Sequence, residues 1–197
     1  MGRKVVIRLA HRRRREGKTD YRQRLKALMG RQTRLVVRRS LKKIACQLIE
    51  HNTEGDHVLL ETSSTKLKSF GWNYSCDTIP AAYLTGLLAG IEAKKKGIAE
   101  AILDIGLYPS TKGNRLYAAL AGFIDAGVAV PCRREILPPP ERLSGRHIAD
   151  YAAKLKSENP GRYNSLFSGY LKAGLAPENI AAEVEKTKNA ILTAGKK

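Results

Sequence analysis

The chain of 197 residues carries 36 lysine and arginine residues against 18 acidic residues, which gives a formal net charge of +18. Its hydrophobic fraction of 43% is ordinary for a folded domain, so the composition excludes a largely disordered chain. Residues 1–43 alone carry +15, which leaves +3 for the other 154 residues. Such an uneven charge favours a large anionic partner: nucleic acid, an anionic membrane surface or an acidic protein.

The cysteines and the lengths of the apolar segments indicate the compartment in which the protein is expected. Cys46, Cys76 and Cys132 are far apart and form no C-x-x-C pair, which argues against a disulfide framework or a zinc ribbon and fits a reducing compartment. No segment approaches the roughly 18 consecutive apolar residues of a membrane span, and the first residues lack the apolar core of a secretory signal. We therefore expect a cytoplasmic protein that makes no membrane contact.

Residues 1–18 are predicted to form a basic arm. Four consecutive arginines, Arg12, Arg13, Arg14 and Arg15, repel one another, and few apolar side chains are present to offset the loss of chain entropy. We expect this arm to become ordered on its partner.

A short basic amphipathic helix follows, capped by Thr19 and ended by Gly30. Tyr21, Leu25 and Leu28 recur at the spacing of one helical face. Three strands are predicted next, at 34–40, 42–50 and 57–63, with a turn at 52–56. The first two strands are expected to form a hairpin, and the polar and aromatic residues 64–76 predict a short helix or a loop.

A long helix is predicted from a cap at Asp77 or Thr78 to Gly97, with Pro80 near its first turn and lysines in its last turn. Its interior is rich in alanine and glycine and apolar on several sides, so we expect it to be buried against a sheet. The elements that follow are a buried strand at 100–106, a loop at 107–114, a second helix that ends near Gly127 and a short strand at 128–131. This order predicts a mixed sheet with helices packed on it.

The chain is predicted to divide into a basic N-terminal arm (1–18), an α/β core that binds RNA (19–132) and a helical C-terminal extension (133–197). Three prolines at 138–140 mark the second boundary. Beyond them, helices are predicted around 141–155, around 163–174 and from Pro177 onward.

The arginines are the first candidate binding residues. An intracellular address signal is the plain alternative, but the positive charge continues into folded elements, at Arg34, Arg38 and Arg39, where such a signal would have no reason to lie. A guanidinium can hold two phosphate oxygens at once and stack on unpaired bases. We favour RNA over DNA because no helix-turn-helix, zinc finger or basic zipper is visible.

Two further segments are candidates. In the loop before the second helix, Gly113 lies between Lys112 and Arg115. The free N–H groups of the helix N-terminus and these two cations could together bind a phosphate. The alternative is a plain strand-to-helix turn. Trp72 lies near Lys66 and Lys68, a combination that can stack on bases and hold phosphates. The alternative is that Trp72 only covers the edge of the core.

Catalytic candidates are poor. Asp104 lies in a predicted central strand, where a nuclease would place a metal ligand, but Glu61 and Asp125 have no recognisable spacing to it, so a satisfied buried acid is favoured. The histidines make no metal motif, and no nucleotide-binding or serine-nucleophile motif is present. We therefore expect no catalytic residue, no metal and no cofactor.

Several long blocks of the sequence are similar to one family. They are "RRRREGKTDYRQRL", "RLVVRRSLKKIACQLI", "TIPAAYLTGLLAGIEAKKKGI", "AILDIGLYPSTKGNRLYAALAGFIDAG" and "GRHIADYAAKL". In order and spacing they resemble the archaeal and eukaryotic type of large-subunit ribosomal protein family eighteen, which binds 5S rRNA. The resemblance covers nearly the whole chain, although it is loose beyond about residue 160.

The resemblance implies a ribonuclease H-like three-layer core with a mixed five-stranded sheet, and no enzymatic activity. It implies that 5S rRNA is bound through the basic N-terminal part and through the loop before the second helix, and that the protein helps attach 5S rRNA to 23S rRNA in the central protuberance, beside other large-subunit proteins. The matching positions are Arg12, Arg13, Arg14, Arg15, Arg22, Arg24, Arg34, Arg38 and Arg39, and Lys112, Gly113, Asn114 and Arg115. Gln32 and Thr33 depart from the lysine and proline that related chains often have.

Two alternatives to a ribosomal role stay open at this point. One is a metal-dependent nuclease on the same fold, and the other is an RNA-binding module that acts outside the ribosome.

Overall fold

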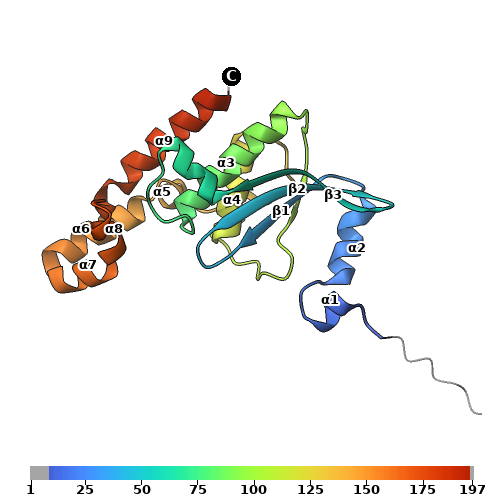
Figure 1. The fold of residues 1–197 in the computed structure, drawn as a ribbon, viewed down its shortest axis with the longest axis horizontal. Helices are drawn as coiled ribbons and strands as arrows, with labels where there is room; N and C mark the ends of the chain where they lie inside the picture. Colours follow the sequence, from blue (N-terminus) through green and yellow to red (C-terminus); the bar gives the residue numbers. More distant parts are fainter. Residues whose placement is uncertain (1–8, 196–197) are drawn as a thin grey trace, which may run out of the picture.

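The computed structural model describes residues 9–195, whose centre is a four-stranded mixed sheet with the strand order β3-β2-β1-β4 (Figure 1). The strands are β1 (Arg34–Arg39), β2 (Ile44–Asn52), β3 (Gly55–Ser63) and β4 (Ile102–Asp104). β1 pairs antiparallel with β2 and parallel with β4, and β2 pairs antiparallel with β3. The prediction of a mixed sheet with helices packed on it is confirmed.

The β1–β2 hairpin is confirmed, with Val37 opposite Cys46. The second strand begins at Ile44, later than expected, because Ser40 and Lys43 close a tight turn: the backbone N–H of Ser40 donates to the carbonyl oxygen of Lys43 at 2.8 Å. β2 and β3 extend to Asn52 and Gly55, so the turn between them is shorter than the predicted 52–56.

Helices α3 (Ile79–Lys95) and α4 (Arg115–Asp125) pack on each other behind the sheet (Figure 1). A Cβ atom on Gly86 would lie 1.8 Å from the carbonyl oxygen of Ala119, and one on Gly122 would lie 2.0 Å from that of Tyr83. The two helix backbones therefore meet at positions where only glycine fits. The expectation that α3 is buried is confirmed, as is its capping by Thr78, whose side chain accepts from Ala81 N.

The fourth and fifth predicted strands are shorter than expected. β4 covers three residues of the predicted 100–106, and in the described chain segment 128–131 makes only one parallel bridge, between Glu100 and Ala129. The backbone N–H of Ala101 donates to Ala129 O at 3.0 Å, and the ladder goes no further. The sheet of residues 9–195 thus has four strands, with this bridge where a fifth was expected.

The C-terminal region is helical as predicted, but its helices are shorter and more numerous. They are η2 (Arg134–Ile136), α5 (Pro140–Leu143), α6 (Arg146–Glu158), α7 (Pro160–Leu166), α8 (Ser168–Lys172), η3 (Pro177–Asn179) and α9 (Ile180–Gly195). Gly145, with a left-handed φ of 81°, separates α5 from α6 within the predicted 141–155. Ile180, Val184 and Ile191 of α9 pack in one cluster with residues of α3, whereas Ala152, Leu155, Tyr163 and Phe167 of the α6–α8 region form a separate small cluster.

The N-terminal part holds α1 (Arg12–Arg15), a single turn where no element was expected, and α2 (Tyr21–Met29). Asp20 rather than Thr19 caps α2, because its carboxylate accepts from the backbone N–H groups of Arg22 and Gln23. The first eight residues of the predicted arm lie outside the described residues. The segment 64–76 begins with the short helix η1 (Ser64–Phe70), as predicted. No described helix is long and apolar enough to cross a membrane.

Candidate nucleic-acid interface

A group of exposed cations lies on α1 and α2, at one end of the sheet (Figure 1). Arg14, Arg15 and Arg22 are exposed and make no ion pair or side-chain hydrogen bond within residues 9–195. Arg12 lies 3.6 Å from Glu16, and Arg13 Nε donates to Thr19 Oγ1 at 2.9 Å, which ties α1 to the start of α2. These guanidinium groups can therefore reach a phosphate at little cost in lost contacts.

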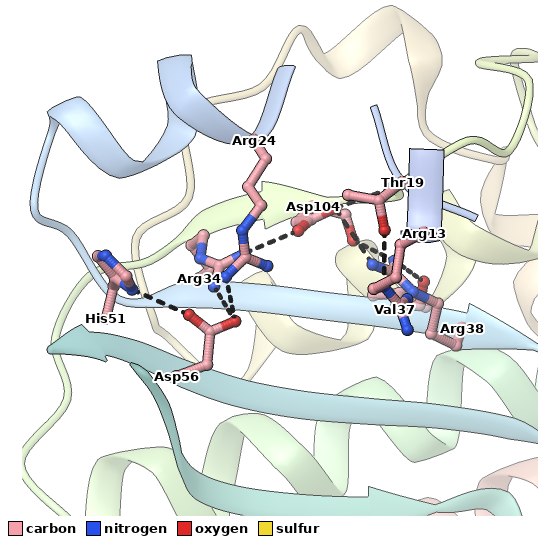
Figure 2. Close-up of polar contacts among 10 residues, drawn as sticks. Arg13, Thr19, Arg24, Arg34, Val37, Arg38, His51, Asp56 and Asp104 are labelled. Carbon is pink, nitrogen blue, oxygen red and sulfur yellow. Dashed lines mark hydrogen bonds and ion pairs between the residues drawn. The ribbon is translucent and has the colours of Figure 1, made fainter. Parts of the chain in front are cut away.

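Arg34 is the opposite case, because its side chain is only 3% exposed and lies between two carboxylates (Figure 2). Its Nη1 donates to Asp104 Oδ2 at 3.1 Å, and its Nη2 lies 3.0 Å from Asp56 Oδ2. The predicted RNA contact through Arg34 does not agree with this position, because almost none of the guanidinium is accessible. Its charge instead joins β1 to β3 and β4.

Asp56 gathers three basic side chains from different elements (Figure 2). Arg24 Nη2 of α2 donates to Asp56 Oδ2 at 2.8 Å, and His51 Nδ1 lies 3.0 Å from Oδ1. Burial raises the pKa of Asp56, but the hydrogen bonds from Arg24 and His51 and the charges of Arg34 and Arg24 outweigh it, so the pKa lies below its ordinary value. Arg24 thereby holds α2 against the sheet.

Asp104 is a satisfied, partly buried acid, as favoured. Besides the ion pair with Arg34, its Oδ1 accepts from Gly106 N at 2.8 Å, and Arg38 Nη1 donates to its backbone carbonyl at 2.9 Å. The residues that the structure describes contain no group of three histidine, cysteine or acidic side chains that could hold a metal ion. Neither Glu61 nor Asp125 interacts with Asp104 in the described contacts.

A groove of about 600 Å³ separates the α1–α2 segment from the sheet. It is lined by five cations, Arg13, Lys18, Arg24, Arg34 and Arg38, and by three acids, Asp20, Asp56 and Asp104. The excess of cations makes this groove, together with the exposed arginines above it, a surface that attracts a polyanion.

The loop before α4 has part of the geometry that was predicted. Asn114 caps α4 by accepting from Tyr117 N at 3.0 Å, and Gly113 has a left-handed φ of 69°. The N–H of Gly113 already donates to Ile136 O, and Arg115 Nη1 donates to Asp77 O and Oδ2 at 2.7 and 3.0 Å. Of the predicted cations in this loop, only Lys112 is exposed and without an ion pair among the described residues.

A small pocket of about 290 Å³ next to this loop brings in further cations. It is lined by Arg39, by loop residues including Gly113 and Asn114, and by Arg142 of α5. Arg39 also lies over the Tyr108 ring, 5.2 Å from its centroid. Sequence reasoning missed Arg142, because no motif links it to a loop almost thirty residues earlier in the chain.

The third candidate segment does not form an aromatic and basic binding site. Trp72 is fully buried, and its Nε1 donates to Ser75 O at 3.2 Å. It therefore has no face to offer to a base and belongs to the core, which is the alternative that the sequence left open. Lys66 and Lys68 are exposed, and Lys66 Nζ donates to Glu61 O at 3.0 Å.

Comparison with known proteins places these features in context. A family model described as "Ribosomal large subunit proteins 60S L5, and 50S L18" matches residues 7–100, which include the basic segment, the hairpin and α3. The large ribosomal subunit protein uL18 of Korarchaeum cryptofilum (strain OPF8) is 50% identical over 185 residues, which cover 94% of each chain. The similarity thus extends beyond the family model into the C-terminal helices.

Proposed function

The chain belongs to the uL18 (L5e/L18) family of large-subunit ribosomal proteins, and from this we propose that it is a structural constituent of the large ribosomal subunit that binds 5S rRNA. The observation that carries the proposal is the set of exposed arginines on α1 and α2, which are free to contact phosphates. The same proposal includes attachment of 5S rRNA to 23S rRNA in the central protuberance, beside neighbouring large-subunit proteins.

The proposed contacts fall into three groups according to exposure. The first is on α1 and α2, with Arg12, Arg13, Arg14, Arg15 and Arg22. The second is around the pocket beside α4: Arg39 and Arg142 line the pocket, Gly113 and Asn114 shape the loop, and Lys112 lies exposed on that loop outside the lining. Lys66 and Lys68 form a third, weaker group, while Arg24, Arg38 and Arg115 act mainly by holding the binding elements in place.

The finer description of the fold is part of this proposal. A ribonuclease H-like core is supported by the order β3-β2-β1-β4, by the parallel β1–β4 pair and by the bridge at Ala129 beside β4. The division into an arm (1–18), a core (19–132) and a C-terminal extension (133–197) is supported by the exposure of 9–18. We keep the second boundary although α9 shares the hydrophobic cluster of α3.

The alternatives are less well supported. The similar protein of Korarchaeum cryptofilum is a large ribosomal subunit protein, and the carboxylate of Asp104 is paired with Arg34 and Arg38. Magnesium-dependent cleavage of RNA that disappears with Asp104→Asn would support a nuclease. Equal affinity for 5S rRNA and for transfer RNA would support a general RNA-binding module.

The decisive experiment is filter binding of a 5S rRNA transcript to the full chain and to two triple variants. Arg14→Ala/Arg15→Ala/Arg22→Ala removes three proposed contacts, and Lys94→Ala/Arg162→Ala/Lys172→Ala removes the same charge from exposed positions elsewhere. Charge-assisted contacts contribute about 1.5 to 3 kcal/mol each, so the first variant should bind at least about a hundredfold more weakly. The control should lose less than about threefold, and equal losses would contradict the proposed surface.

A further inference from the structure

A second, larger groove lies between the C-terminal helices and the loops beside the β1–β2 turn. It encloses about 1060 Å³ and is lined by residues of α6, α7, α8 and η1, by the turn at 40–43 and by 73–76. Figure 1 places α6, α7 and α8 at the end of the molecule opposite to α1 and α2. The proposed RNA contacts on α1 and α2 therefore leave this groove free.

The floor of the groove is a preformed set of aromatic rings. The ring of Tyr170 lies 5.3 Å from that of Tyr74 and 6.3 Å from that of Phe167, measured between centroids. Tyr74 is buried, and its hydroxyl donates to Ala176 O at 2.7 Å, which fixes the ring. A floor that is already ordered costs little conformational entropy when something binds to it.

The rim of the groove exposes large apolar side chains from three separate elements. Leu41 in the β1–β2 turn is 93% exposed, Leu166 in α7 is 56% exposed and Tyr151 in α6 is 44% exposed. All three line the same groove, so their apolar surfaces are neighbours rather than scattered single residues. Gathered exposed apolar surface of this kind marks an interaction site.

The charges around the groove indicate what kind of partner it fits. Lys42 and Lys68 line it, and no aspartate or glutamate is among the described residues that do so. A second copy of this protein would bring its own net charge of +18, so self-association is disfavoured.

The shape of the groove indicates how a partner would bind. No residue of the described strands lines it, so an added strand would find no sheet edge to pair with. A helix that lays its apolar face into a groove needs only side-chain contacts. RNA would place its phosphates along an apolar rim, where few groups could replace their hydration.

We propose that this groove binds an amphipathic helix of another protein, with apolar side chains on one face and acidic side chains beside them. The apolar face covers the rings of Tyr74, Phe167 and Tyr170 and meets Leu166 and Tyr151 at the rim. The carboxylates pair with Lys42 and Lys68, so Lys68, named above in the weaker group of RNA contacts, is here assigned to the helix instead of RNA. The proposal goes beyond ribosomal RNA binding and is independent of whether 5S rRNA is the RNA partner.

The test is selection from a displayed library of random peptides of about 16 residues, long enough for four helical turns, against the full RNA-free chain. Peptides are counter-selected on Tyr151→Asp/Leu166→Asp, which places two acids on the rim. The matched control, Val58→Asp/Leu192→Asp, makes the same kind of change at exposed apolar positions outside this groove and outside the groove beside α1 and α2. Thermal melting of both variants establishes that they fold.

Selected peptides should carry apolar residues at helical spacing with acidic neighbours and should bind the groove variant at least about tenfold more weakly than the wild type and the control, as measured by fluorescence anisotropy. The variant Lys42→Glu/Lys68→Glu should lower the affinity of the selected peptides by a similar factor. Failure to enrich such peptides, or equal affinity for the groove and control variants, would overturn the proposal. Random RNA 12-mers serve as a second probe. If their affinity fell tenfold in the groove variant but not in the control, the groove would be assigned to RNA and the proposal of a bound helix would be overturned.

Discussion

Arg34 is the described side chain that pairs with both Asp56 and Asp104, and its removal should destabilise the fold. Arg34→Ala leaves Asp56 and Asp104 without the buried cation between them, and breaking a buried ion pair costs about 3 to 5 kcal/mol. We expect a loss of about 3 kcal/mol in the free energy of unfolding, because both carboxylates keep other partners. Urea unfolding measures it.

The control for this prediction is Arg22→Ala, which removes an exposed arginine that has no ion pair among the described residues. Its free energy of unfolding should change by less than about 0.5 kcal/mol, while its affinity for RNA should fall. If Arg34→Ala were as stable as Arg22→Ala, the ion pairs of Arg34 would not stabilise the sheet.

Asp56 should make the stability of the fold depend on acid pH. Its pKa is lower in the folded chain than the ordinary value of about 3.9, so its contribution is fully present above that value and is lost as the pH falls through the folded-state pKa. Asp56→Asn lacks this contribution at every pH. The difference in urea midpoint between wild type and Asp56→Asn should therefore shrink as the pH falls below about 4. A difference that grew below about pH 4 would contradict the assigned ion pairs.

At the residue scale, the sequence gives the number of charged side chains but does not show which of them form ion pairs. Arg34 was interpreted as an RNA contact because it continues a basic run, and its partner Asp104 lies seventy residues away in another strand. Trp72 similarly stands beside lysines in the sequence while its ring is fully buried. Both outcomes follow from strand pairing and packing, which residue spacing alone does not reveal.

At the scale of elements, the contact between α3 and α4 gives a sharp expectation. Gly86→Ala would place a Cβ within 1.8 Å of the Ala119 carbonyl oxygen, which is backbone and cannot rotate away. Alanine gains about 1 kcal/mol in helix propensity, but forcing two helices apart costs about 1 to 3 kcal/mol or more. We expect Gly86→Ala to lower the melting temperature by several degrees.

Gly169→Ala in α8 is the matched control, because an added Cβ there meets nothing within 4 Å. It should leave the melting temperature unchanged or raise it slightly, as helix propensity alone predicts. Equal destabilisation by the two substitutions would contradict the close contact between α3 and α4.

Most elements could be predicted because local signals agree with tertiary packing. The cap at Thr78 and the alanine- and glycine-rich interior of α3 identified a buried helix, and β2 alternates between buried and half-buried residues from Ile44 to Ile49, as a strand with one face on the core should. Errors arose where two local signals compete: Asp20 and Thr19 can both cap α2, and the aspartate accepts two backbone hydrogen bonds. Gly145 interrupts a helical pattern that its neighbours continue, and its left-handed backbone ends α5.

For the whole molecule, the affinity for RNA should depend steeply on salt. Leaving aside Arg142 and the weaker group of Lys66 and Lys68, seven exposed cations are proposed to contact phosphates, namely Arg12, Arg13, Arg14, Arg15, Arg22, Arg39 and Lys112. With a slope of about −0.7 for each phosphate contact, the logarithm of the association constant should fall with the logarithm of salt concentration at a slope of about −5. Filter binding of 5S rRNA between 50 and 300 mM KCl measures it, and a slope shallower than about −2 would show that phosphates are not the main contacts.

The position of these cations near one end of the chain also affects how fast the protein associates with RNA and in which orientation. Residues 9–31, which contain α1 and α2, have nine basic and two acidic residues (+7), whereas the 164 residues 32–195 have 22 basic and 16 acidic residues (+6), so the described part of the molecule has its positive charge concentrated at the α1–α2 end. In the field of a polyanion such a body rotates before it collides, so encounters begin with α1 and α2 and seldom with α6, α7 or α8. Association should therefore be fast, and most encounters should begin with α1 and α2 against the RNA. The end that holds α6, α7 and α8 should then face away from the RNA.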